Sequence, residues 1–246
     1  MKPRVLAVIP ARLGSTRFPR KVIHDWKGRP LLAWLTAELA RSKHIDRLVV
    51  ATDSKEVRRA LGDEVEVIMT SKRHRTGSDR AAEVHATLGG DYVLNIQADN
   101  FDLKAALVDR VIERFIKDRQ VDFATVARRI DNDEDLFDPN TVKVVTGRDG
   151  RALWFSRYPL PYVRGATDGE RFRQHRYWYH IGVYLFRAAG LKRFARWPRS
   201  ALEKAESLEQ LRVLENGGTL RVYQTRARTV SVDTPQDLKK LERCYK

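Results

Sequence analysis

The first half of this chain alternates short apolar runs with segments of helical periodicity, and this alternation constrains its fold more than any other feature. Each apolar run stops abruptly at polar residues, which is typical of a strand buried on both faces. The predicted strands span residues 4–10, 47–52, 65–69 and 92–97. The predicted helices span residues 30–41, 54–61, 78–88 and 103–117. This order predicts an α/β fold, with a mostly parallel twisted sheet and helices on both of its faces.

After residue 120 the pattern changes, and strand-like segments dominate. Further strands are predicted at residues 121–129, 141–146, 152–155, 177–186, 220–224 and 229–232. Asn216-Gly-Gly218 predicts the end of a helix, and an amphipathic helix is predicted from Pro235 to Tyr245. No linker or repeat separates the two halves. We therefore expect one domain over residues 1–246, with a smaller lobe at about 130–205 inserted into its sheet.

Composition and charge narrow the class of protein. The 246 residues carry 47 Lys and Arg against 32 Asp and Glu, and the net charge of +15 favours anionic partners. The basic residues are scattered along the chain and the aromatic residues lack RNA-binding spacing, so no nucleic-acid partner is expected. No apolar run approaches the roughly 20 residues of a membrane span. Cys244 is the single cysteine, which excludes a disulfide framework and predicts a soluble cytoplasmic protein.

The loop after the first predicted strand, Pro10-Ala-Arg-Leu-Gly-Ser-Thr-Arg-Phe-Pro-Arg-Lys21, is rich in cations and small residues. Ligands of an open parallel sheet bind at the carboxyl ends of its strands. There the backbone N–H groups around Gly14 and the cations of Arg12, Arg17 and Lys21 can surround a triphosphate. It is not a Walker loop, because the Gly-Lys-Ser/Thr ending is absent. A basic surface loop without a ligand is the alternative interpretation.

Two more polar segments stand at strand ends. The segment His74-Arg-Thr-Gly-Ser-Asp-Arg80 starts a helix that Thr76 or Ser78 can cap. Its N-terminus can hold a base or a phosphate, or it can be a helix start without a ligand. The segment Asn95-Ile-Gln-Ala-Asp-Asn100 follows the fourth strand. Its Asp99 suits Mg²⁺, which takes one or two carboxylates together with substrate oxygens. Asp233 is a second candidate ligand, although it also stands where a helix cap belongs.

From about residue 5 to residue 241 the chain resembles the CMP-3-deoxy-manno-octulosonate (CMP-Kdo) synthetase family of sugar-acid cytidylyltransferases. No single matching segment is decisive, but their order and spacing are highly specific. They are residues 11–21, 49–53, 76–80, 137–145, 155–157, 180–184, 208–212 and 232–235. The resemblance implies a nucleotide-diphospho-sugar-transferase-like fold, with the lobe serving dimerisation and sugar binding. A homodimer is therefore expected.

The resemblance also implies the reaction: CTP is coupled to 3-deoxy-manno-octulosonate (Kdo), giving CMP-Kdo and pyrophosphate for lipopolysaccharide biosynthesis, with Mg²⁺ as cofactor. It implies catalytic roles for Arg12, Lys21, Asp99 and Asp233, the two aspartates holding the metal. The implied nucleotide-binding residues are Arg12, Ser15, Thr16, Arg17, Lys21, Arg75, Thr76 and Gln97. The implied sugar-binding residues are Arg157, His180, Tyr184, Glu209 and Gln210. The planar fork of Arg157 would pair with the sugar carboxylate.

One segment departs from the family pattern, which usually reads Gln-Gly-Asp-Glu-Pro. Here the chain has Gln97-Ala98-Asp99-Asn100-Phe101, so the aspartate is kept while its neighbours change. Two alternatives therefore stand beside Kdo activation. One is activation of a related acidic sugar, an amino-substituted octulosonate or a nonulosonate. The other is a nucleotide-binding homologue without turnover.

Overall fold

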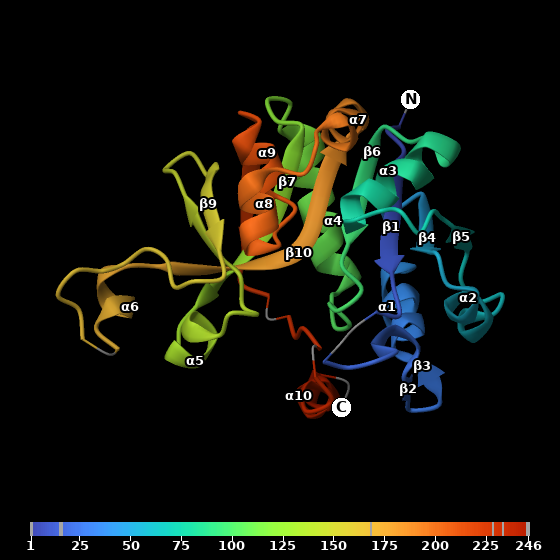
Figure 1. The fold of residues 1–246 in the computed structure, drawn as a ribbon, viewed down its shortest axis with the longest axis horizontal. Helices are drawn as coiled ribbons and strands as arrows, with labels where there is room; N and C mark the ends of the chain where they lie inside the picture. Colours follow the sequence, from blue (N-terminus) through green and yellow to red (C-terminus); the bar gives the residue numbers. More distant parts are fainter. Residues whose placement is uncertain (1, 15–16, 168, 228, 233, 245–246) are drawn as a thin grey trace.

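The computed structural model describes residues 2–14, 17–167, 169–227, 229–232 and 234–244, and Figure 1 shows their arrangement. Within these residues a nine-stranded sheet runs through the molecule. Its strands are β1 Val5–Ala11, β4 Arg47–Thr52, β5 Val67–Met69, β6 Tyr92–Ile96, β7 Phe123–Ile130, β8 Lys143–Thr146, β9 Ala152–Ser156, β10 Tyr177–Arg187 and β11 Leu220–Thr225. A separate two-stranded hairpin pairs β2 Asp25–Trp26 with β3 Arg29–Pro30.

Helices fill the connections between these strands. They are α1 Leu31–Leu39, α2 Lys55–Leu61, α3 Gly77–Leu88, α4 Ala105–Lys117, α5 Asp133–Phe137, α6 Arg171–Gln174, α7 Ala188–Arg196, α8 Ala201–Glu206, α9 Leu211–Glu215 and α10 Asp237–Cys244, with a 3₁₀ turn at Lys21–Ile23. In the described part of the chain, no helix combines the length and the apolar character that crossing a membrane requires.

The predicted α/β sheet is confirmed, and its strand order explains its two parts. The main path runs β11-β7-β10-β6-β1-β4-β5. Strands β6, β1, β4 and β5 are parallel, as predicted from their alternation with helices. Strand β10 lies between β6 and β7 and is antiparallel to both, and β8 and β9 continue the antiparallel part. The sheet is therefore mixed: one parallel part comes from the first half of the chain, and β11 pairs with β7 in parallel at the other edge.

Two hydrophobic clusters cover the two faces of the sheet. Val5, Ala7 and Ile9 of β1 pack with α1 and α4, whereas Leu6 and Val8 pack with α3 and α7. Alternate residues of a strand point to opposite faces, so the uninterrupted apolar run of β1 has a burial site for every side chain. This double coverage leaves the strand ends as the accessible edge for a ligand.

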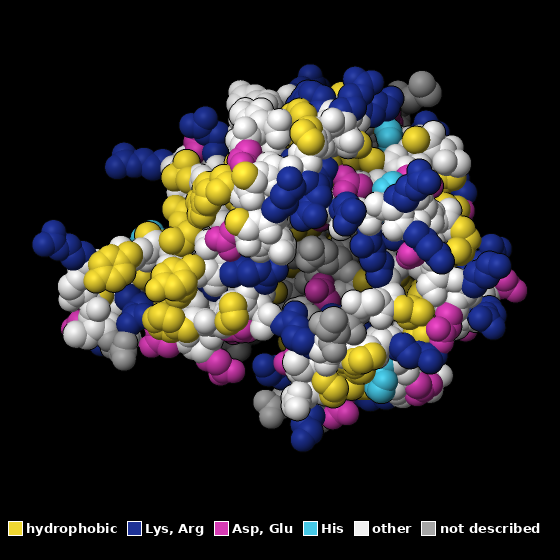
Figure 2. Space-filling view, viewed as in Figure 1, with side chains coloured by type: hydrophobic (Ala, Val, Ile, Leu, Met, Phe, Trp, Pro, Cys, Tyr) yellow, Lys and Arg dark blue, Asp and Glu magenta, His cyan; other side chains and the backbone are white. Residues whose placement is uncertain are grey.

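Residues 131–180, here called the arm, project from the main sheet; α5, β9 and α6 lie to its left in Figure 1. Four large apolar side chains on the arm are exposed, and hydrophobic atoms gather on this part of the surface in Figure 2. They are Phe137, Leu153, Tyr158 and Tyr162. Helix α7, also inside the predicted lobe of residues 130–205, packs instead against α3 and β10. The lobe boundaries and the count of one domain stay predictions.

The predicted strand over residues 229–232 is wrong. The backbone N–H of Val230 donates to Asp102 Oδ1 at 2.7 Å, and that of Val232 donates to the Asp99 carbonyl at 3.1 Å. These donors therefore go to the loop after β6 instead of a neighbouring strand. As a result, a segment late in the sequence lies beside the segment that contains Asp99.

Candidate active site

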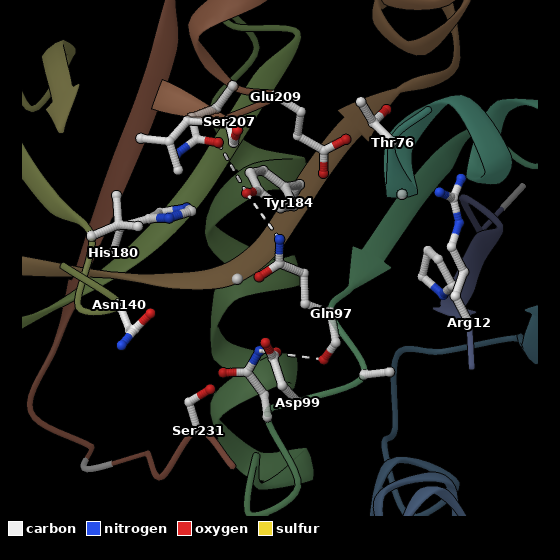
Figure 3. A pocket seen from close by; sticks show the side chains of 18 of the residues that line it. Arg12, Thr76, Gln97, Asp99, Asn140, His180, Tyr184, Ser207, Glu209 and Ser231 are labelled. Atoms are coloured by element: carbon white, nitrogen blue, oxygen red, sulfur yellow. Dashed lines mark hydrogen bonds between the residues drawn. The ribbon is translucent and has the colours of Figure 1, made fainter. Parts of the chain in front are cut away.

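A cavity of about 570 Å³ opens at the carboxyl ends of β1 and β6 and continues along β10. Twelve of the predicted site residues line it: Arg12, Arg17, Lys21, Arg75, Thr76, Gln97, Asp99, Arg157, His180, Tyr184, Glu209 and Gln210. The other three, Ser15, Thr16 and Asp233, lie outside the described residues. Figure 3 shows Arg12 and Thr76 on one side of the cavity, His180 and Asn140 on the other, and Gln97 between them.

Positive side chains stand around the cavity. Arg12 donates to the main-chain oxygen of His74, and Arg17 donates to the side chain of Asn140 across the cavity mouth. Lys21 is 8% exposed, and its Nζ donates to the Val232 carbonyl at 2.5 Å. Arg75 is exposed on the loop before α3. Four positive side chains around one hollow can hold a polyanion.

The start of α3 is already occupied by side chains of the protein. Thr76 and Asp79 form a capping box at this helix start. Glu209 Oε2 accepts from the backbone N–H of Ser78 at 2.9 Å. Burial raises the pKa of the Glu209 carboxyl, while the hydrogen bond from Ser78 acts against that rise. The Ser78 N–H is therefore not available to a phosphate, and Glu209 takes the anion position predicted for this helix end.

Three polar side chains form a chain through the centre of the cavity. Gln97 Nε2 donates to the Tyr184 hydroxyl at 3.5 Å, and that hydroxyl donates to Gln210 Oε1 at 3.1 Å, as the dashed lines in Figure 3 show. Gln210 is 2% exposed, and its Nε2 has no hydrogen-bond partner within the described residues. Burial, with the charges of Glu209 and Asp99, raises the pKa of Tyr184, which stays a neutral hydroxyl.

His180 is a neutral ring beside that chain. Burial lowers the pKa of His180 to about 3, and the ring is 5% exposed. Its Nε2 lies 2.8 Å from the Thr125 hydroxyl, which itself donates to the Val183 carbonyl at 2.7 Å. With the hydroxyl proton assigned to that carbonyl, the Thr125 oxygen accepts from His180, and Nε2 is assigned as the protonated nitrogen. Nδ1 is then an acceptor, suited to a sugar hydroxyl.

Arg157 is fixed by main-chain oxygens. Its Nε donates to the Glu206 carbonyl at 2.8 Å and its Nη1 to the Pro139 carbonyl at 2.9 Å. Its Nη2 has no such partner among the described residues. The predicted fork is thus partly used by the protein, so only its Nη1–Nη2 end can approach a ligand carboxylate.

Lys143 was not predicted as a functional residue. It is fully buried, and its Nζ donates to the carbonyls of Asp138 at 2.9 Å and Arg157 at 2.6 Å. Burial lowers its pKa to about 8. The sequence does contain a signal for Lys143, because this residue belongs to the segment 137–145 that matches the family pattern. Asn140 of the cavity wall belongs to the same segment.

The residues around Asp99 offer few ligands to a Mg²⁺ ion. Asp99 lines the cavity, and Ser231 lies next to it in Figure 3. Asn100 is buried, and its Nδ2 donates to Asp99 Oδ1 at 3.1 Å and to the Gln97 carbonyl at 3.3 Å. The described residues contain no cluster of three or more potential ligands. The Asp99 carboxylate, in a cavity that is also lined by cations suited to phosphates, nevertheless fits Mg²⁺, which keeps waters and substrate oxygens.

An α/β sheet with a cation-lined cavity at the ends of its parallel strands defines a nucleotide-binding class of protein. Within that class, residues 6–240 match the family model described as cytidylyltransferase. The chain therefore belongs to the cytidylyltransferase family, whose members are nucleotidyltransferases.

The predicted resemblance to CMP-Kdo synthetases is confirmed by relatives. A Geobacter sulfurreducens protein named 3-deoxy-manno-octulosonate cytidylyltransferase is 41% identical over 96% of this chain and 97% of its own. A Bdellovibrio bacteriovorus protein of the same name is 41% identical over 98% and 97%. A solved CMP:2-keto-3-deoxy-manno-octonic acid synthetase complexed with CTP superposes with a TM-score of 0.87, at 33% identity and 98% coverage of both chains.

Proposed function

We propose that this chain transfers CMP from CTP to 3-deoxy-manno-octulosonate, with Mg²⁺ as cofactor, and so supplies CMP-Kdo for lipopolysaccharide biosynthesis. The observation that carries the proposal is that one cavity is lined both by cations, among them Arg12 and Lys21, and by hydrogen-bonding side chains such as Tyr184, with Asp99 in the same wall. Such an arrangement suits a polyphosphate and a polyhydroxylated acid at the same time.

The reaction is a direct displacement. The anomeric hydroxyl oxygen of the sugar acid forms a bond to the α-phosphorus of CTP, the bond from that phosphorus to the β-phosphate oxygen breaks, and pyrophosphate leaves. The hydroxyl proton passes to solvent. No covalent enzyme intermediate is needed, so this chain contributes positioning and charge stabilisation.

At the nucleotide end, Arg12 and Lys21 bind the triphosphate, with Arg17 and Arg75 adding positive charge. Gln97 and Thr76 lie against the cytidine, where an amide can both donate to and accept from a cytosine edge. Asp99, together with Asp233, holds Mg²⁺, which supplies charge neutralisation of the phosphates when bound. The contact between Val232, the residue before Asp233, and the Asp99 carbonyl supports this pairing.

At the sugar end, Arg157 faces the carboxylate, and the free Nδ1 of His180 accepts from a hydroxyl. The buried Gln210 Nε2, which has no partner within the described residues, is a donor suited to another hydroxyl. Tyr184 and Glu209 complete this wall. A buried donor left unpaired costs about 1–3 kcal/mol, so a ligand that satisfies it gains selectivity.

The test is pyrophosphate release with each of the four NTPs, Mg²⁺ and a panel of sugar acids. We expect CTP with Kdo to give the highest kcat/KM, and UTP to be used far less well. Equal use of UTP, or an adenine preference, would contradict the nucleotide assignment. Turnover of an amino-substituted octulosonate or a nonulosonate, but not of Kdo, would keep the family and change the sugar.

A homologue without turnover is the second candidate, favoured only by the departures at Ala98, Asn100 and Phe101. Phe101 is fully buried in the hydrophobic cluster of α1 and α4, and Ala98 packs against that cluster. These replacements are therefore accommodated by the fold, which supports a working site. Absence of pyrophosphate release with every acid, together with CTP binding in calorimetry, would favour the second candidate.

A homodimer formed through the arm and a cytoplasmic location are also proposed. The exposed Phe137, Leu153, Tyr158 and Tyr162 support the arm as the interface, because apolar patches of this kind mark contact surfaces. The proposed cytoplasmic location is supported by the single cysteine of the sequence, Cys244, which fits a reducing compartment. The dimer has its own test. Light scattering coupled to gel filtration should give twice the chain mass, and Tyr158→Asp with Tyr162→Asp should give the monomer mass. A monomer in the wild type would contradict the dimer.

A further inference from the structure

Gly182 of β10 lies directly under the side chain of Gln97. A Cβ atom at position 182 would stand 2.1 Å from Gln97 Oε1, 2.6 Å from its Cδ and 3.0 Å from its Cβ. The backbones are also joined, because Gln97 N–H donates to the Gly182 carbonyl at 2.8 Å. No side chain larger than hydrogen fits at position 182 while Gln97 keeps this conformation.

Backbone conformation does not explain the glycine. Gly182 is absent from the residues with positive φ, so alanine could adopt its backbone without strain. The register between β10 and β7 shifts between Ile181 and Tyr184, at the point where β10 meets Gln97. A glycine inside a strand is typical of a close approach by another group, and here that group is Gln97.

We propose that Gly182 is a positioning residue that holds Gln97 in the cavity by leaving room for its side chain. With Gln97 seated on Gly182, its amide reaches the Tyr184 hydroxyl, which donates to Gln210. Any side chain at position 182 displaces the Gln97 amide and breaks the first link of this chain. The proposal rests on the proposed function, since it assigns the effect to the same substrate cavity.

The experiment is a double-mutant cycle with Gly182→Ala, Gln97→Ala and the double variant. Gln97→Ala should lower kcat/KM by roughly tenfold or more, the size expected for lost hydrogen bonds. Gly182→Ala should change the KM for CTP, the KM for the sugar and kcat in the same directions as Gln97→Ala does. In the double variant the two effects should not multiply. Wild-type constants for Gly182→Ala, or multiplied effects in the double variant, would overturn the proposal.

Gly190→Ala is the matched control. A Cβ at position 190 would stand 2.8 Å from the Cβ and carbonyl oxygen of Asp122, in a buried place that does not line the cavity. It should lower the melting temperature but leave the kinetic constants within about twofold of wild type. Kinetic losses in Gly190→Ala as large as in Gly182→Ala would mean that crowding anywhere in the fold disturbs the cavity.

Thermal unfolding separates failure of this inference from failure of the proposed function. If the wild type releases no pyrophosphate with any sugar acid, the proposed function fails, yet the clash between the two side chains can still be measured. Gly182→Ala should lower the melting temperature clearly less in the Gln97→Ala background than in the wild type. Equal decreases in both backgrounds would show that Gly182 does not act through Gln97.

Discussion

Lys143 Nζ lies 2.6 Å from the main-chain oxygen of Arg157, and no part of the Lys143 side chain reaches solvent. The same ammonium donates to the Asp138 carbonyl, so it joins the two chain segments that carry Asn140 and Arg157 into the cavity wall. A buried lysine whose ammonium donates to main-chain oxygens fixes the backbone of the cavity wall without touching a substrate.

Replacing Lys143 by Met should therefore harm sugar binding more than nucleotide binding. The variant keeps the volume but removes a donor from the Arg157 and Asp138 carbonyls. Because the Asp138 carbonyl keeps the Thr141 N–H, the loss falls mainly on the Arg157 carbonyl, at about 1–3 kcal/mol. We expect the KM for the sugar acid to rise by roughly tenfold, a smaller change in the KM for CTP, and a lower melting temperature. Lys192→Met, at an exposed position of α7, is the control. Equal increases in both KM values would argue against this role of Lys143.

Asp99→Asn should reduce turnover by several orders of magnitude while leaving the fold intact. The carboxylate lines the cavity, and losing a metal-held charge should remove several kcal/mol of transition-state stabilisation. Chelation by EDTA should abolish wild-type activity, and added Mg²⁺ should restore it. Asp63→Asn, at an exposed position outside the cavity, should behave as wild type. Near-normal turnover of Asp99→Asn with Mg²⁺ would exclude Asp99 as a metal ligand.

Arg157→Lys keeps the positive charge but loses the planar fork. Since Nε and Nη1 already bind the carbonyls of Glu206 and Pro139, lysine cannot hold both and still present a donor to a carboxylate. We expect the sugar KM to rise at least about tenfold, clearly more than the CTP KM. The comparison is steady-state kinetics beside Arg196→Lys, an exposed position on α7. An unchanged sugar KM would remove Arg157 from the sugar end.

His180 should make stability fall as pH decreases from about 6.5 to about 3. Its pKa is lowered from 6.5 to about 3 by burial, so within this window the unfolded chain binds a proton that the folded chain does not. The free energy of unfolding therefore rises with pH across this window. Above about pH 6.5 the contribution of His180 no longer changes with pH.

Urea unfolding checks this linkage in the wild type and in His180→Asn. The difference in unfolding free energy between the two proteins should shrink by roughly 2 kcal/mol between pH 6.5 and pH 5. Between pH 7 and pH 8 it should stay constant, which serves as the control. A difference that is the same at pH 5 and pH 7 would mean that His180 is accessible to protons in the folded state.

The first half of the fold could be predicted because its strands are buried on both faces. The runs that became β1, β4 and β6 consist of apolar residues that helices cover on each side. The antiparallel direction of β10 could not be predicted, since the apolar pattern of a strand buried on both faces does not depend on the direction of the strand. The hairpin of β2 and β3 was missed because two-residue strands carry no periodicity; Lys27 and Gly28 turn it with positive φ.

The candidate site could be predicted where its residues follow strands. Arg12, Gln97 and Asp99 stand at strand ends, and parallel strands bring such ends together. Lys143 was not predicted because a lysine within a strand usually indicates a position that faces solvent. Gly182 was not predicted because the glycine is required by the side chain of Gln97, a residue distant in sequence that follows β6, and no local pattern contains this contact. Ser15, Thr16 and Asp233 lie outside the described residues, so their predictions stay open.

The hydrogen bond from Lys21 to the Val232 carbonyl joins residues 211 positions apart. A ribosome adding 5–20 residues per second needs about 10 to 40 s to pass from one to the other. During that interval the Val232 segment has not yet been made, and the parallel strands can form before the loop after β1 is anchored by this hydrogen bond. A growing chain therefore carries much of the sheet but an incomplete cavity, and the proposed nucleotide site is finished only when the Val232 segment has emerged.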